Sequence, residues 1–144
     1  MVSMCDSSIP LTTGEWEEWG NPNEEKYHAY MESYSPMENI RRGKKPEVLV
    51  TSGLFDPRVA YWEGAKYAAR MRDAATNGAF GDGDCEGEGE GGEAPSRILL
   101  KTDMDAGHFS ATDRYKRFKE RAYEHAFVLD SLGLSGAKPA WAKR

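Results

Sequence analysis

The sequence predicts an α/β protein with parallel strands joined by crossover helices. Short, nearly continuous apolar runs occur at 47–53 and 96–102, and a helical pattern follows each of them. The order strand, helix, strand, helix favours a parallel sheet with right-handed crossovers. Because two strands do not form a stable sheet alone, we expect this sheet to be incomplete.

The first predicted strand, EVLVTSG at 47–53, carries three consecutive apolar residues at 48–50. Such a run is typical of a strand buried on both faces of a parallel sheet. The second predicted strand is SRILLKT at 96–102. Residues 1–23 contain several Gly and Pro residues and are predicted to be irregular.

Helices are predicted over 24–32, after the first strand, and over about 110–132. Pro57 suits a first helical position, and Asp56 before it could cap the helix. A period near 3.6 residues marks the side chains expected to face the core. These are Val59, Trp62, Ala65 and Ala69 in the middle helix, and Tyr115, Phe118, Ala122, Ala126 and Leu129 in the last.

Residues 1–132 are predicted to form one domain, followed by a tail at 133–144. The domain is interrupted at 77–95 by a glycine- and acid-rich stretch. This composition cannot bury enough apolar surface to offset its ordering entropy, so we expect a disordered surface insertion. An alternative is an EF-hand-like calcium loop, because Asp82, Asp84, Glu86, Gly87, Glu88 and Glu93 match its spacing. Gly89 at its usually apolar eighth position and Pro95 where a helix should begin argue against that alternative.

The charge of the chain is unevenly distributed. Without the six carboxylates of 77–95, the net charge of −5 would become +1. The nearly neutral remainder gives no case for binding nucleic acid or a membrane surface. The first residues lack the basic and long apolar segments of a signal peptide, so we expect a cytoplasmic protein.

Two residues with catalytic potential follow the predicted strands. Asp56 ends the first strand, in GLFDP, and His108 follows the second, in DAGHF. Ligands of parallel sheets bind at the carboxyl ends of strands, and an acid followed by a histidine is the α/β-hydrolase order. In such sites the histidine is the base and the carboxylate orients it. By spacing alone, Asp56 could equally be only a helix cap, and His108 a solvated turn residue.

The nucleophile of such a site is absent from this sequence. It should precede the acid in a G-x-S-x-G elbow, and no such motif occurs before Asp56. Ser52 lacks the preceding glycine, and Ser135 in GLSGA comes after His108. These 144 residues alone therefore should not perform acyl transfer by this mechanism.

Three segments closely resemble the oligopeptidase B branch of the prolyl oligopeptidase family of serine peptidases. They are MCDSSIPLTTGEWEEWGNPNEEKYHAYMESYSPMENI, VTSGLFDPRVAYWEGAKYAARMR and LLKTDMDAGHFSATDRYKRFKERAYEHAF. The resemblance covers about residues 4–129, except the acidic insertion. It implies that the chain is the carboxyl-terminal part of an α/β-hydrolase catalytic domain.

The resemblance also implies roles for particular residues. Asp56 corresponds to the triad acid and His108 to the triad base. Glu15 corresponds to the acid that receives a basic substrate side chain, and Glu17 to the second acid of that pocket. Trp16 could form a wall of the pocket, as could Trp19. The alternative for the glutamates is a solvated acidic turn.

The family resemblance implies cleavage of short peptides after Arg or Lys, with no metal or organic cofactor. It also implies two parts that this sequence lacks: an upstream segment with the serine, and a β-propeller that restricts entry. Two alternatives stay open. The chain could be a catalytically inactive interaction module, or it could complete its site with a separate serine-bearing chain.

Overall fold

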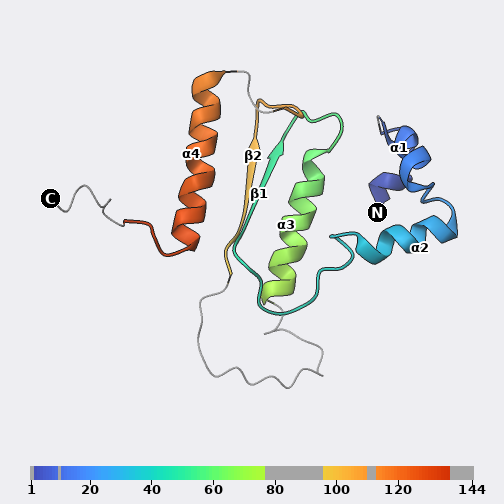
Figure 1. Cartoon of the computed structure of the whole chain (residues 1–144), viewed down its shortest axis with the longest axis horizontal. Helices are drawn as coiled ribbons and strands as arrows, with labels where there is room; N and C mark the ends of the chain where they lie inside the picture. The colour runs from blue at the N-terminus through green and yellow to red at the C-terminus, as the bar shows by residue number, and fades with distance from the viewer. Residues whose placement is uncertain (1, 10, 77–95, 110–112, 137–144) are drawn as a thin grey trace. The chain divides into compact units, whose positions relative to one another are not determined.

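A computed structural model describes residues 2–9, 11–76, 96–109 and 113–136 (Figure 1). The chain divides into two compact units, residues 1–108 and residues 109–144. The predicted insertion at 77–95, with its calcium-loop alternative, lies outside the described residues, as do the last eight residues of the predicted tail. The elements are η1 (Val2–Cys5), α1 (Thr12–Trp19), α2 (Glu25–Tyr34), β1 (Val48–Gly53), α3 (Tyr61–Thr76), β2 (Ile98–Asp103) and α4 (Arg114–Ser131).

The two strands form a parallel pair, which confirms the predicted strand order and direction. Val48 lies opposite Ile98 at one end of the ladder, and Gly53 lies opposite Asp103 at the other. Both strands therefore end at the same edge of the sheet. The loops that begin there carry Asp56 and His108.

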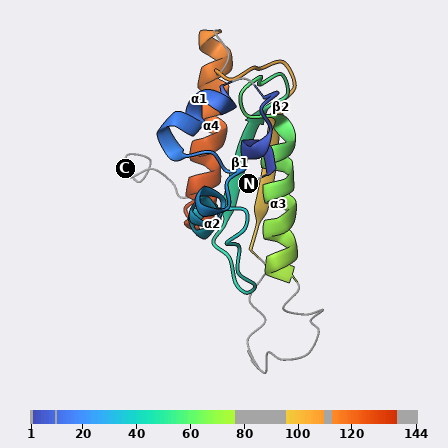
Figure 2. The ribbon, with the colours of Figure 1, turned by 90° about the vertical axis from the view of Figure 1, so that its right-hand side faces the viewer.

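Helix α3 packs along one face of the strand pair, as Figures 1 and 2 show. The centre of this packing consists of Ala68, Met71 and Ile98, which are all buried. The partly buried side chains around it include Val48, Val50, Tyr67 and Leu100. The strands are mostly half-buried rather than buried on both faces, since one helix covers one face in the described unit.

The predicted core-facing stripe of α3 was wrong by one residue in register. Val59 and Trp62 are 53% and 43% exposed, and Ala69 is exposed. The helix instead presents Gly64 to the sheet, where an added Cβ would lie 3.3 Å from Val50 Cγ1. A helix approaches a sheet most closely where it has no side chain, so Gly64 selects this face. Ala68 and Met71 follow it at positions +4 and +7.

The amino-terminal region is more regular than predicted, since it contains both η1 and α1. The breakers at Gly20 and Pro22 follow α1 and end it, and Gly20 has a left-handed φ of 95°. The indole Nε1 of Trp16 donates to the carbonyl oxygen of Met4 at 2.9 Å. This hydrogen bond ties α1 to η1, and such tertiary contacts override the breaker pattern of the sequence.

The second unit contains α4, whose existence was predicted correctly. Asp113 caps it by accepting hydrogen bonds from the backbone N–H groups of Tyr115 and Lys116, at 2.7 and 2.9 Å. The predicted burial of its apolar stripe was wrong, because no residue of α4 is buried and Tyr115 is 74% exposed. Periodicity shows which side chains share a face, but not whether another element covers that face.

Among the described residues, no helix has both the length and the apolar character that a membrane span requires.

Candidate active site

Backbone contacts join the loops that follow the two strands. The N–H of Leu54 donates to the carbonyl of Asp103 at 2.9 Å, and that of Phe55 donates to the carbonyl of Ala106 at 3.0 Å. Gly53 lies so close to the second loop that an added Cβ would be 2.6 Å from the carbonyl oxygen of Gly107. The two loops are therefore held together just beyond the sheet edge.

We expect Gly53→Ala to destabilise the protein by roughly 1–3 kcal/mol, because its Cβ would collide with backbone atoms of residues 106–107. Equilibrium denaturation measures this change. The control is Gly14→Ala in α1, where nothing lies within 4 Å of the new Cβ. A helix-interior alanine should leave stability unchanged or raise it by about 1 kcal/mol. Equal stabilities for the two variants would contradict the close approach at Gly53.

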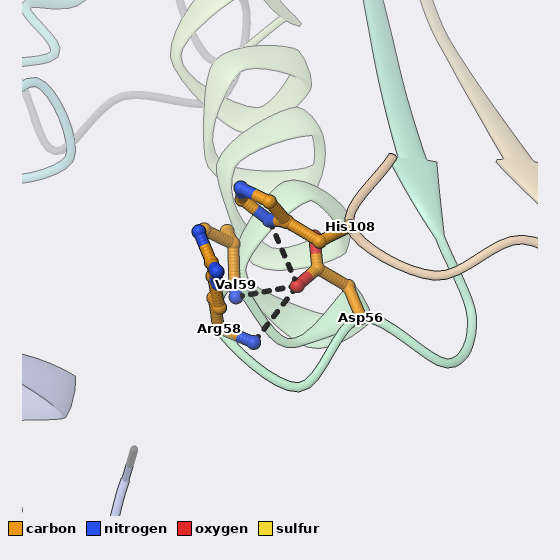
Figure 3. A network of polar contacts seen from close by, with 4 residues as sticks. All are labelled: Asp56, Arg58, Val59 and His108. Carbon is orange, nitrogen blue, oxygen red and sulfur yellow. Dashed lines mark hydrogen bonds and ion pairs between the residues drawn. The ribbon is translucent and has the colours of Figure 1, made fainter. Parts of the chain in front are cut away.

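The contact between Asp56 and His108 is the central feature of this region (Figure 3). Nδ1 of His108 lies 3.0 Å from Asp56 Oδ2 and 3.1 Å from Oδ1. Oδ1 also accepts hydrogen bonds from the backbone N–H groups of Arg58 and Val59, at 2.8 and 2.9 Å. Asp56 thus does cap a turn, as the alternative interpretation suggested, but α3 begins only at Tyr61 and the carboxylate contacts His108 as well.

Electrostatics keep the Asp56 carboxylate ionised. Desolvation acts to raise the pKa of Asp56. The hydrogen bonds from Val59, Arg58 and His108 outweigh it and hold this pKa below its ordinary value. The Asp56 side chain is 11% exposed and that of His108 is 32% exposed. An ionised carboxylate at Nδ1 orients the imidazole, while Nε2 lies at the opposite edge of the ring.

A groove of about 630 Å³ begins at this pair. One wall comes from η1, α1 and the chain between them, and the other from the loop after β1 and the start of α3. The first wall includes Ser3, Met4, Leu11 and Glu15. The second includes Asp56, Val59, Trp62 and Glu63, with His108 beside them.

The structure brings three of the four predicted site residues to this groove. Asp56, His108 and Glu15 line it, whereas Glu17 is not among the lining residues, and both glutamates are exposed. Glu15 and Glu17 are two residues apart on a helix, so their side chains point about 200° apart around the helix axis and cannot both face the groove. Among the described residues, Trp62 lines the groove in place of the expected Trp16 and Trp19.

Sequence reasoning missed Ser3 and Glu63. Ser3 Oγ donates a hydrogen bond to Glu63 Oε1 across the groove, from η1 to α3. No local pattern signals a contact between residues 60 positions apart. Within the described part of the chain, no group of three or more His, Cys, Asp or Glu residues is arranged to hold a metal ion.

Parallel strands, a crossover helix and an acid–histidine contact beyond their carboxyl ends define the carboxyl-terminal part of an α/β-hydrolase fold. The sequence profile of the prolyl oligopeptidase family, a family of serine peptidases, matches residues 1–135. The chain therefore belongs to the prolyl oligopeptidase family. This confirms the family that the sequence resembles.

Known proteins support this assignment. The chain is 40% identical to Protease 2 of Moraxella lacunata over 134 residues, which are 93% of this chain and 17% of that protein. It is also 40% identical to dipeptidyl aminopeptidase BI of Pseudoxanthomonas mexicana over 135 residues, 94% of this chain and 16% of that protein. The chain thus spans about a sixth of the length of these relatives.

Two solved structures agree in fold. Oligopeptidase B of Leishmania major matches with a TM-score of 0.73 and 52% identity, over 92% of this chain and 16% of that one. The closed form of oligopeptidase B of Trypanosoma brucei, with covalently bound antipain, matches with a TM-score of 0.74 and 50% identity, over the same shares. The chain is therefore similar to oligopeptidase B in both sequence and fold.

Proposed function

We propose that this chain supplies the acid and the base of a serine peptidase of the oligopeptidase B type. Asp56 is the acid and His108 is the base. The serine nucleophile and the propeller belong to a part of the protein outside these 144 residues, consistent with the small share of each relative that the chain covers. The substrates are short peptides cleaved after Arg or Lys.

The single observation that carries the proposal is the contact of Asp56 with Nδ1 of His108 at 3.0 Å. In acyl transfer, Nε2 takes the proton of the serine hydroxyl and later gives it to the leaving amine. A carboxylate at Nδ1 holds the ring in the required tautomer and stabilises the imidazolium. The same contact lies beside the groove, where a peptide can reach it.

The proposed specificity rests on Glu15. Its carboxylate lines the same groove as the acid–histidine pair. Glu15 is exposed, so a substrate side chain can reach it. A carboxylate binds a guanidinium through a bidentate, charge-assisted pair, a geometry that an ammonium does not match. Glu17 stays a prediction, since it is not among the residues that line the groove.

The test of this function uses the full-length protein that contains this chain. We expect it to hydrolyse short fluorogenic peptides that end in Arg or Lys, and to react with a fluorophosphonate probe at a serine outside residues 1–144. A protein that neither hydrolyses these peptides nor reacts with the probe would contradict the proposal. It would favour the alternative of an inactive interaction module.

In that protein, Glu15→Gln should lower kcat/KM for Arg substrates by roughly 10- to 100-fold, because a charged hydrogen bond contributes about 1.5–3 kcal/mol. Cleavage of peptides with a neutral residue at the same position should change little. Glu18→Gln is the control, because Glu18 lies on the same helix but is not among the residues that line the groove. An unchanged ratio of Arg to neutral substrates would remove Glu15 from the proposal. The same assay on Glu17→Gln decides the role of Glu17.

A further inference from the structure

We infer that Ser3 and Glu63 are positioning residues that hold the two walls of the groove at their working separation. The inference rests on the proposed function, because it concerns the same groove. Ser3 Oγ donates to Glu63 Oε1, and both residues line the groove. Their hydrogen bond joins η1 to α3, so its effect on the site would pass through the position of the amino-terminal wall.

A short series of contacts links Glu63 to the carboxylate proposed to bind substrate. Ser3 and Met4 are neighbours in η1. The carbonyl of Met4 accepts the indole N–H of Trp16 at 2.9 Å, and Trp16 follows Glu15 in α1. Fixing Ser3 on α3 therefore also fixes the segment that carries Glu15.

The amino-terminal wall needs such a contact because it adds little to the core. The buried cluster of this unit is made by α3 and the strands, around Ala68, Met71 and Ile98. In α1, Thr12 is the buried residue, while Leu11 and Trp19 at its ends are 57% and 52% exposed. A wall held by few apolar contacts depends more on individual hydrogen bonds for its position.

The second wall is fixed independently. Glu63 lies in the first turn of α3. Its own backbone N–H donates to the carbonyl of Ala60 at 2.9 Å. One residue further, Gly64 is in close contact with Val50 of β1. Glu63 is thus a rigid attachment point near the Asp56 turn, to which the less firmly held wall is bonded.

The test compares Glu63→Ala, Glu63→Gln and Ser3→Ala, with Lys66→Ala on the exposed side of α3 as the control. A glutamine keeps the oxygen that accepts the Ser3 hydrogen bond, but an alanine does not. In the full-length peptidase, Glu63→Ala and Ser3→Ala should each raise KM for Arg substrates about fivefold or more with kcat within about twofold. Glu63→Gln and the control should stay near wild type, and the double alanine variant should be no worse than either single one.

Amide hydrogen exchange of the full-length protein gives a second measurement that does not depend on peptidase activity. Exchange over 2–19 should speed up in Glu63→Ala and Ser3→Ala but not in Glu63→Gln. Unchanged exchange in both alanine variants, or equal acceleration in Glu63→Gln, would overturn the inference. A wild-type protein without peptidase activity would contradict the proposed function, while the exchange result would still decide the role of Ser3 and Glu63.

Discussion

Replacing His108 with alanine is expected to lower kcat for peptide cleavage by roughly 10⁴- to 10⁶-fold, with little change in folding. The reason is that the imidazole would transfer protons in both halves of acyl transfer, and alanine leaves no group to do so. His108 is 32% exposed and its Nδ1 contacts Asp56, so its removal opens no buried cavity. The measurement is steady-state hydrolysis of an Arg substrate by the full-length protein.

His125→Ala is the matched control, because His125 is an exposed histidine in α4. It should hydrolyse the same substrate at the wild-type rate. Activity of His108→Ala within about tenfold of wild type would show that another group serves as the base. Circular dichroism of both variants separates loss of chemistry from loss of structure.

Asp56→Asn is expected to lower kcat by about 10⁴-fold near neutral pH. The amide oxygen of asparagine can still accept the N–H groups of Arg58 and Val59, so the turn should persist. What is lost is the charge at Nδ1 of His108, together with the tautomer that this carboxylate selects. The low pKa of Asp56 means that the wild-type side chain is ionised across the neutral range.

Asp113 provides a control with the same local geometry. Its carboxylate accepts the backbone N–H groups of the residues two and three positions later, as that of Asp56 does. Asp113→Asn should therefore show what the loss of a capping charge costs without the loss of a histidine contact. Equal effects of the two substitutions on kcat would reduce Asp56 to a capping residue.

The strand pair illustrates what local pattern predicts well. The runs at 47–53 and 96–102 were recognised from their apolar residues, and the observed bounds differ by at most two positions. Their parallel pairing followed from the intervening helix. The face of α3 was predicted wrongly because its sequence has alanines on several sides, and the close approach at Gly64 selected among them.

Some residues of the candidate site could also be predicted from the sequence, and others could not. Asp56 and His108 became candidates through their position after successive strands, since parallel strands place their carboxyl ends together, and family resemblance implied their roles. Glu15 and Glu17 were implied by family resemblance, and the groove separates them because they project from different sides of α1. Ser3 and Glu63 were missed, since a hydroxyl and a carboxylate 60 residues apart have no joint signature.

The sequence alone determined the fold class, the family and the acid–histidine pair, because each depends on local pattern or on residues in a specific order. The tertiary structure decided which face α3 packs against the sheet, the close approach of the two loops at Gly53, and the side chains that line the groove with Glu15. These features depend on distances between segments far apart in the chain. Such distances are set by packing and by hydrogen bonds that close only in the folded protein.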